Sequence, residues 1–310
     1  MHDHAAFLAA VTANPDDDLP RLVYADWLEE NGEAARAEFI RIQCELERCT
    51  PDDDRRATLQ KREAALLKKH RVAWTAEAAE ANLATDWRFR RGFLHAASVA
   101  AQRFHAVAEP LFRVAPTVRA VTLTQGSGAV EGILRTPQLT KVSELTLSKM
   151  CTCGRCAILA ELRTLFASPL VANLTHLTVA EDRIDPETVA ALVSSPHLTR
   201  VRGLDLSQNA VGLGGVRVLA AARGFTELKE LNLSENGISA SGGQVLARAS
   251  WLKGLRVLNL SRNRLTDTSG KSLLNAEFGD DLVKLELRTN EFGREVKRLL
   301  QSKYGSRVQV

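Results

Sequence analysis

Three cysteines lie close together in the middle of the chain, at a spacing that can bind metal or form a redox pair. They are Cys151, Cys153 and Cys156, in a C-x-C-x-x-C arrangement. A closed zinc site needs four ligands, and His176 is the candidate for the fourth. Because no second cysteine pair lies nearby, we interpret the three residues as reduced thiols in an inserted loop. A zinc site and a redox pair are the alternatives.

The rest of the chain contains no motif for catalysis or cofactor binding. It has no G-x-G-x-x-G and no G-x-x-x-x-G-K-[ST] sequence, and its seven histidines are scattered without a recognised nucleophile motif. The acidic run from Asp16 to Asp18 is typical of a helix N-terminus. We therefore predict a protein that is not an enzyme and carries no cofactor.

Charge is divided unevenly along the 310 residues, whose net charge is +4. The first ninety residues hold 13 basic and 18 acidic side chains, and the remainder holds 28 and 19. The basic residues are not interleaved with aromatic ones, which make up 5% of the chain, so the pattern argues against nucleic-acid binding and favours an acidic protein partner. The absence of an 18-residue apolar run and of a basic start predicts a cytoplasmic protein without a membrane span.

The strongest pattern is a repeat of 27 residues. Leu204, Leu231, Leu258 and Leu285 are equivalent in the segments VRGLDLSQNAV, LKELNLSENGI, LRVLNLSRNRL and LVKLELRTNEF. Their shared pattern, L-x-x-L-x-L-x-x-N-x-L, resembles the leucine-rich repeat. The resemblance implies short parallel strands whose alternate leucines point into a core.

An asparagine follows each of these strands, at Asn209, Asn236, Asn263 and Asn290. Each side chain is expected to bond backbone groups where the chain turns out of the strand, and a helical stretch follows. A strand and a full helix in each repeat resemble the ribonuclease-inhibitor type. This implies an α/β solenoid, a curved horseshoe with a parallel sheet on the concave side and helices outside.

Weaker copies extend the array toward the N-terminus, to about eight repeats over residues 89–292. Their central residues are Leu177, Leu145, Val121 and Ala97. The step from Leu145 to Leu177 is five residues longer than the norm, and the surplus falls at the three cysteines. Because a solenoid exposes an apolar face at each end, we interpret residues 293–310 as a C-terminal cap.

Residues 1–88 show helical spacing and little strand signal. They contain the string NPDDDLPRLVYADWLEENGEAARAEFIRIQCEL, and FRRGFLHAASV follows them. Both resemble the repeat-companion domain of planctomycete bacteria, a short helical module that precedes leucine-rich repeats. The resemblance implies a small all-α N-terminal module that also caps the repeats, and it brings no established activity.

The residues that flank the inward leucines are expected to line the concave face in columns. From these columns the predicted partner-binding residues are Thr146, His176, Thr178, Asp205, Glu230, Asn232, Asn259, Lys284, Glu286 and Arg288. The face is polar and mixed in sign, and it has few of the aromatic anchors that tight interfaces use.

These features predict a protein–protein interaction scaffold that presents its concave surface to a protein partner, whose identity the sequence does not reveal. The alternative is a regulator of an enzyme, such as a ribonuclease-inhibitor-like blocker or a GTPase-activator-like protein. We expect the chain to be a monomer.

Overall fold

The computed structural model describes residues 2–50, 52–126, 128–150 and 158–310. The chain divides into two compact units. We call residues 1–99 and 106–121 the helical unit, and residues 100–105 and 122–310 the solenoid.

The helical unit opens with four helices. They are α1 (His2–Ala13), α2 (Leu19–Glu30), α3 (Ala34–Arg48) and α4 (Arg56–Glu80). Pro20 lies in the first turn of α2, and Gly32, with a φ of 84°, allows the tight turn into α3. Buried Leu28 of α2 and Ile40 of α3 share one apolar cluster, and Phe39 lies in a second with Leu66 of α4. The apolar faces of the helices thus form the core of this unit.

A hairpin follows the helices, so the unit is helical through Glu80 and contains strand from Asp86 onward. The antiparallel strands are β1 (Asp86–Arg90) and β2 (Phe93–Ala100). At the turn, Gly92 has a φ of 85°, and its amide donates a 2.6 Å hydrogen bond to Oε1 of Gln43. A Cβ atom on Gly92 would lie 2.3 Å from Cγ1 of Ile40. Only glycine therefore allows the hairpin to approach α3 this closely.

Two elements cross the boundary between the units, α5 (Ala101–Val114) and β3 (Ala120–Thr124). The solenoid then alternates strands with helices. Its strands are β4 (Glu144–Ser148), β5 (His176–Ala180), β6 (Gly203–Asp205), β7 (Glu230–Asn232), β8 (Val257–Asn259), β9 (Lys284–Glu286) and β10 (Val308–Gln309). Its α-helices are α6 (Val130–Leu134), α7 (Ile158–Phe166), α8 (Pro186–Val193), α9 (Gly212–Ala221), α10 (Ala240–Leu246), α11 (Asp267–Leu274) and α12 (Arg294–Tyr304). The short 3₁₀ segments in the described part of the chain are η1 (Pro137–Lys141), η2 (Pro169–Val171), η3 (Ser250–Gly254) and η4 (Gly305–Arg307).

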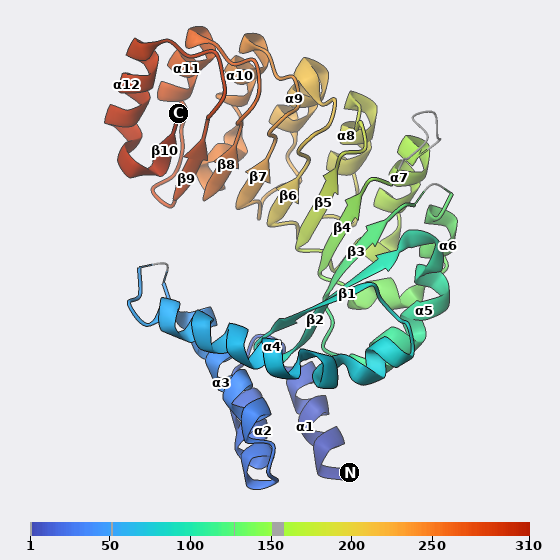
Figure 1. The fold of residues 1–310 in the computed structure, drawn as a ribbon. Helices are drawn as coiled ribbons and strands as arrows, with labels where there is room; N and C mark the ends of the chain where they lie inside the picture. The colour runs from blue at the N-terminus through green and yellow to red at the C-terminus, as the bar shows by residue number, and fades with distance from the viewer. Residues whose placement is uncertain (1, 51, 127, 151–157) are drawn as a thin grey trace. The chain divides into compact units, whose positions relative to one another are not determined.

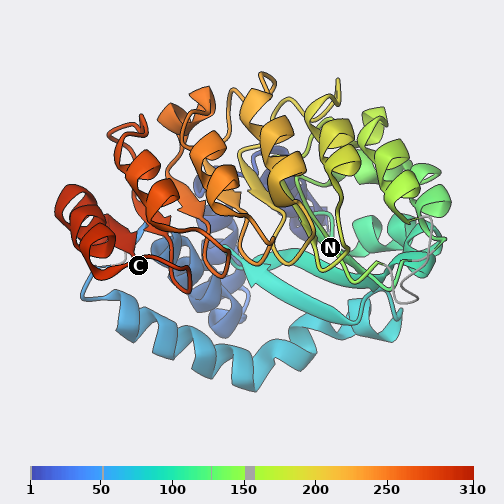
Figure 2. The same cartoon turned by 90° about the horizontal axis from the view of Figure 1, so that it is seen from above.

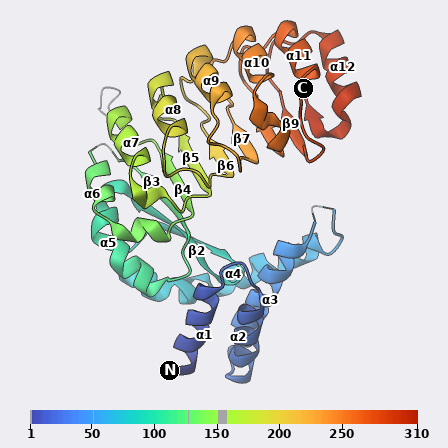
Figure 3. The same cartoon turned by 180° about the vertical axis from the view of Figure 1, so that it is seen from behind.

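Strands β4 to β10 of the solenoid form a parallel sheet in chain order. The sheet lines the inner side of the solenoid's arc, and α7 to α12 lie outside it (Figures 1 and 3). Figure 2 shows these helices side by side along the outer rim. The predicted α/β solenoid with an inner parallel sheet is therefore confirmed for this unit.

The repeat leucines occupy the predicted register. Leu204, Leu231, Leu258 and Leu285 pair strand by strand and are at most 2% exposed. A second leucine two residues later in each strand segment is also buried. Because successive strand residues alternate between faces, the residue between the two leucines points to the concave side.

The asparagine of each clear repeat bonds the backbone on two sides, as predicted. The Nδ2 atom of Asn263 donates to the carbonyl of Leu233 in the preceding repeat and to that of Leu260 in its own. Its Oδ1 atom accepts from the amides of Asn236 and Ile238. Asn209, Asn236 and Asn290 repeat this arrangement in part or in full. The ladder satisfies backbone groups that would otherwise be buried without partners.

A left-handed residue stands immediately before each of these asparagines. Gln208, Glu235, Arg262 and Thr289 have φ between 55° and 57°. Gln125, Lys149 and Glu181 adopt the same conformation at the ends of β3, β4 and β5. The copies centred on Val121, Leu145 and Leu177 therefore make the same turn without the asparagine.

The last helix and strand pack against α11 and β9. Val296 and Leu300 of α12 are buried, and the hydroxyl of Tyr304 donates a 2.6 Å hydrogen bond to the carbonyl of Leu273 on α11. Strand β10 pairs with β9, with Val308 opposite Leu285. These contacts join α12 and β10 to the last repeat.

Candidate partner-binding surface

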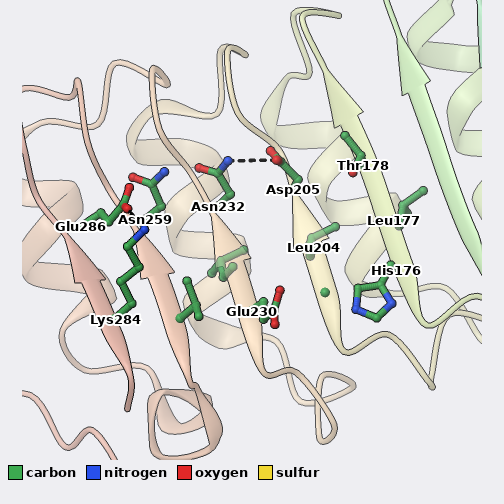
Figure 4. A pocket seen from close by; sticks show the side chains of 13 residues that line it. His176, Leu177, Thr178, Leu204, Asp205, Glu230, Asn232, Asn259, Lys284 and Glu286 are labelled. Atoms are coloured by element: carbon green, nitrogen blue, oxygen red, sulfur yellow. Dashed lines mark hydrogen bonds and ion pairs between the residues drawn. The ribbon is translucent and has the colours of Figure 1, made fainter. Parts of the chain in front are cut away.

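Most of the predicted concave-face residues lie together on one surface of the solenoid. The register aligns Thr146, Thr178, Asp205, Asn232, Asn259 and Glu286 in one column. A groove of about 380 Å³ crosses β5 to β9 (Figure 4). Its lining includes the predicted residues His176, Thr178, Asp205, Glu230, Asn232, Asn259, Lys284 and Glu286. We call it the concave groove.

The central column of the concave groove is held by the backbone of its own strands. Oδ1 of Asp205 accepts a hydrogen bond from the amide of Ser207, and Oδ1 of Asn232 accepts one from the amide of Ser234. Asn259 repeats the arrangement with Ser261 at 2.9 Å. These local hydrogen bonds fix the three side chains before a partner binds, so binding costs little side-chain conformational entropy there.

Asp205 and Asn232 are also joined across strands. Nδ2 of Asn232 donates a 2.9 Å hydrogen bond to Oδ2 of Asp205 (Figure 4). Asn259 occupies the next position of the column, and no hydrogen bond from its Nδ2 is made to any part of the chain that the structure describes. That amide donor faces the groove and is available to a partner.

His176 lies at one end of the groove on an exposed surface, at the start of β5. A Cβ atom on Gly203 would lie 2.3 Å from Cδ2 of His176, so the imidazole covers the glycine of the next strand. Thr175 contacts Nδ1 of His176 through its hydroxyl at 3.1 Å. Gly203 was not a predicted site residue. It is the one residue without a side chain in the column formed by His176, Gly203, Glu230, Val257 and Lys284.

The floor of the groove carries an excess of acidic groups. Lys284 and Glu286 form an ion pair along β9. Asp205 and Glu230 form no ion pair within 4 Å among the described residues. The groove thus presents two carboxylates that are not held in an ion pair by any residue the structure describes.

A second hollow, of about 440 Å³, adjoins the groove at the N-terminal ends of the strands. Arg202, Lys229 and Arg256 line it, and Arg202 pairs with Glu227 at 3.0 Å. Sequence reasoning missed this basic rim. Its signal is a basic residue two positions before the central leucine in three successive repeats, at the same 27-residue spacing.

Comparison with known proteins identifies the repeat. A family described as Leucine Rich repeat matches residues 226–247 and 255–274, which contain β7, α10, β8 and α11. The chain carries leucine-rich repeats. No curated protein matches it.

Solved structures that resemble part of this chain have low sequence identity to it. A protein from Bacteroides fragilis is 14% identical over 82% of this chain and 83% of its own, with a TM-score of 0.46. An internalin from Listeria monocytogenes is 17% identical over 69% of this chain, with a TM-score of 0.38. The aligned region spans 57% of the internalin chain.

The remaining predicted site residues lie elsewhere. Arg288 is exposed beyond the end of β9 and does not line the concave groove. Cys151, Cys153 and Cys156 lie outside the described residues. Within residues 2–50, 52–126, 128–150 and 158–310, no three histidine, cysteine or acidic side chains are grouped as metal ligands, and no helix is long and apolar enough to cross a membrane.

Proposed function

We propose that this leucine-rich-repeat protein is a non-enzymatic scaffold whose concave groove binds an extended segment of a partner protein. The observation that carries the proposal is the ordered column from Thr178 to Glu286. Five neighbouring strands each contribute one short polar side chain to it in register. Such a column suits the regularly spaced groups of an extended peptide.

Charge indicates the chemistry of the bound segment. Asp205 and Glu230 favour a lysine or arginine of the partner over the groove floor. Lys229 and Arg256 favour an acidic residue at the rim. The net charge of the second part of the chain predicted an acidic partner. Because the groove floor is itself acidic, we propose that the bound segment carries a basic residue as well.

We also propose that the repeats are of the ribonuclease-inhibitor type and that residues 1–88 form a repeat-companion module and cap. Support for the first comes from α8 to α11, which give each repeat a helix of seven to ten residues. Support for the second is the motif resemblance and the four helices of that segment. Residues 293–310 serve as the C-terminal cap in the same proposal.

Site-specific crosslinking tests the proposed function. A photoreactive amino acid at Asn259, in the groove, is compared with one at Lys271, an exposed position on α11. We expect a protein adduct from the groove position and none from α11 after irradiation in cells. With the partner purified, Glu230→Lys should weaken binding roughly tenfold, whereas Lys271→Glu leaves it unchanged. Equal adducts from both positions would contradict the proposal.

A further inference from the structure

Arg36 of α3 is surrounded by aromatic rings inside the helical unit. Its guanidinium carbon lies 4.8 Å from the ring centroid of Trp74 and 5.3 Å from that of Phe89. Phe39 and Phe93 lie at 5.6 and 5.8 Å. The rings come from α3, α4, β1 and β2, so four elements converge on this cation. Ring faces stabilise a cation through their quadrupoles.

The rings supply no hydrogen-bond acceptor for the guanidinium. Neither a hydrogen bond nor an ion pair joins the Arg36 side chain to any residue that the structure describes, and its Nη1 atom is buried. Burial lowers the pKa of Arg36 to about 10, with Tyr24 and Glu33 acting in the opposite direction. An arginine has five N–H donors in one plane, and leaving them unpaired in a partly dry site is costly.

A pocket of about 210 Å³ opens beside Arg36, entirely within the helical unit. Its apolar lining is formed by Leu8, Trp74, Phe93, Leu94, Val114 and Pro116, with Thr117 alongside. Tyr24 and His4 close one side, joined by a 2.6 Å hydrogen bond between the tyrosine hydroxyl and Nδ1 of the imidazole. The volume is below that of drug-sized sites, so a ligand here is small.

We propose that this Arg36 pocket binds a small monocarboxylate with an apolar body. The carboxylate pairs with the in-plane donors of Arg36 in the forked geometry that guanidinium and carboxylate share. The apolar body packs against Leu8, Val114 and Pro116.

Glu33 sets the charge of the ligand. It lines the same pocket, is exposed, and begins the turn into α3. Its carboxylate repels a second negative charge on the ligand, which disfavours a phosphate dianion and favours a single carboxylate. The free acid and the C-terminus of a peptide share this chemistry. The site is separate from the concave groove and does not depend on the function proposed for it.

Calorimetric titration of the full-length protein tests the assignment with four probes. They are phenylacetate, its neutral amide phenylacetamide, N-acetyl-phenylalanine as a mimic of a peptide C-terminus, and inorganic phosphate. We expect saturable one-to-one binding of at least one carboxylate, and at least tenfold weaker binding of the amide. Tighter binding of N-acetyl-phenylalanine identifies a peptide terminus as the ligand, and tighter binding of phenylacetate identifies a free acid.

Variants locate the binding. Arg36→Met should abolish it and Arg36→Lys should weaken it, because lysine lacks the planar fork. The matched control is Arg88→Met, which removes an exposed arginine from β1 and should leave binding unchanged. Because Arg36→Met removes the centre of an aromatic cluster, Leu8→Phe provides a second test that fills the pocket and keeps Arg36. The proposal is overturned if neither carboxylate saturates, if the amide binds equally well, if phosphate alone binds, or if Leu8→Phe binds as the wild type does.

Discussion

At the level of single residues, Asn236 shows how one side chain of the asparagine ladder bonds the backbone of two repeats. Asn236 is 2% exposed, and its Nδ2 atom donates to the carbonyls of Leu206 and Ser234. Its Oδ1 atom accepts from the amide of Val211. No other side chain of this size offers two donors and an acceptor in that arrangement.

Asn236→Ala should therefore be strongly destabilising. It leaves buried backbone groups of two repeats unpaired, at a cost of about 3 kcal/mol in the free energy of unfolding. Urea denaturation measures the loss. Asn275→Ala, at the exposed C-terminal end of α11, is the control and should cost less than about 1 kcal/mol. Equal effects of the two substitutions would show that the ladder is not a source of stability.

Thr289 carries backbone strain that the sequence pattern conceals. It is exposed and β-branched, and it has a φ of 56°. The left-handed conformation costs an ordinary residue about 1–2 kcal/mol, whereas asparagine adopts it readily. Thr289→Asn should raise the free energy of unfolding by about 1 kcal/mol. Thermal melting measures the change, and Thr226→Asn, at an exposed turn position without positive φ, should have no such effect.

The two cysteines that the structure describes are free and buried. Burial raises the pKa of the Cys44 thiol to about 12, with a smaller contribution in the same direction from Asp18. The thiolate is the reactive form, so Cys44 should escape alkylation by iodoacetamide at pH 8 in the folded protein and react once urea unfolds it. Peptide mass mapping reads the result. Modification of Cys44 before unfolding would contradict its burial.

At the level of elements, the 27-residue period predicted strand positions and leucine register, because a parallel sheet forces equivalent residues into line. It did not predict the turns of the weaker copies. Gln125 and Lys149 adopt the left-handed conformation there although neither is a glycine or an asparagine, so the residue types at these two positions gave no signal. The groove was predicted through its columns, whereas the close approach of His176 to Gly203 depends on packing across strands. The contact between Gly92 of the hairpin and Ile40 of α3 also joins residues that are far apart in the sequence, so the sequence pattern did not predict it.

Leu231→Ala tests the packing of one repeat. Leu231 is 1% exposed and lies between Leu204 and Leu258 in the sheet. Removing its side chain should cost about 2 to 5 kcal/mol, because the neighbouring strands cannot close the cavity. Val283→Ala, which truncates a residue that is 55% exposed, should change stability by less than about 0.5 kcal/mol. A cost below about 1 kcal/mol for Leu231→Ala would argue against a tightly packed repeat.

At the level of the whole molecule, the arginine pocket shows what pattern analysis leaves out. The sequence assigned chemistry only to the cysteines and the repeat face. Arg36 lies within a motif, R-A-E-F-I-R-I-Q, that indicated family resemblance and helical structure alone. Its role depends on Trp74, Phe89 and Phe93, which are 38 to 57 positions away in the chain and meet it only in the folded unit.

The solenoid should lose stability locally, because each repeat contacts chiefly its neighbours. Strand β7 pairs only with β6 and β8 within the sheet, and α10 packs against α9 and α11. In such an array a cavity in one repeat lowers the stability of the neighbouring repeats most, and the effect decreases with distance along the solenoid. Hydrogen exchange of Leu231→Ala should therefore show the largest loss of amide protection in β6, β7 and β8, and a smaller loss in β4, three strands away. An equal loss in β4 would mean that the solenoid opens as one cooperative body, and the nearest-neighbour description would fail.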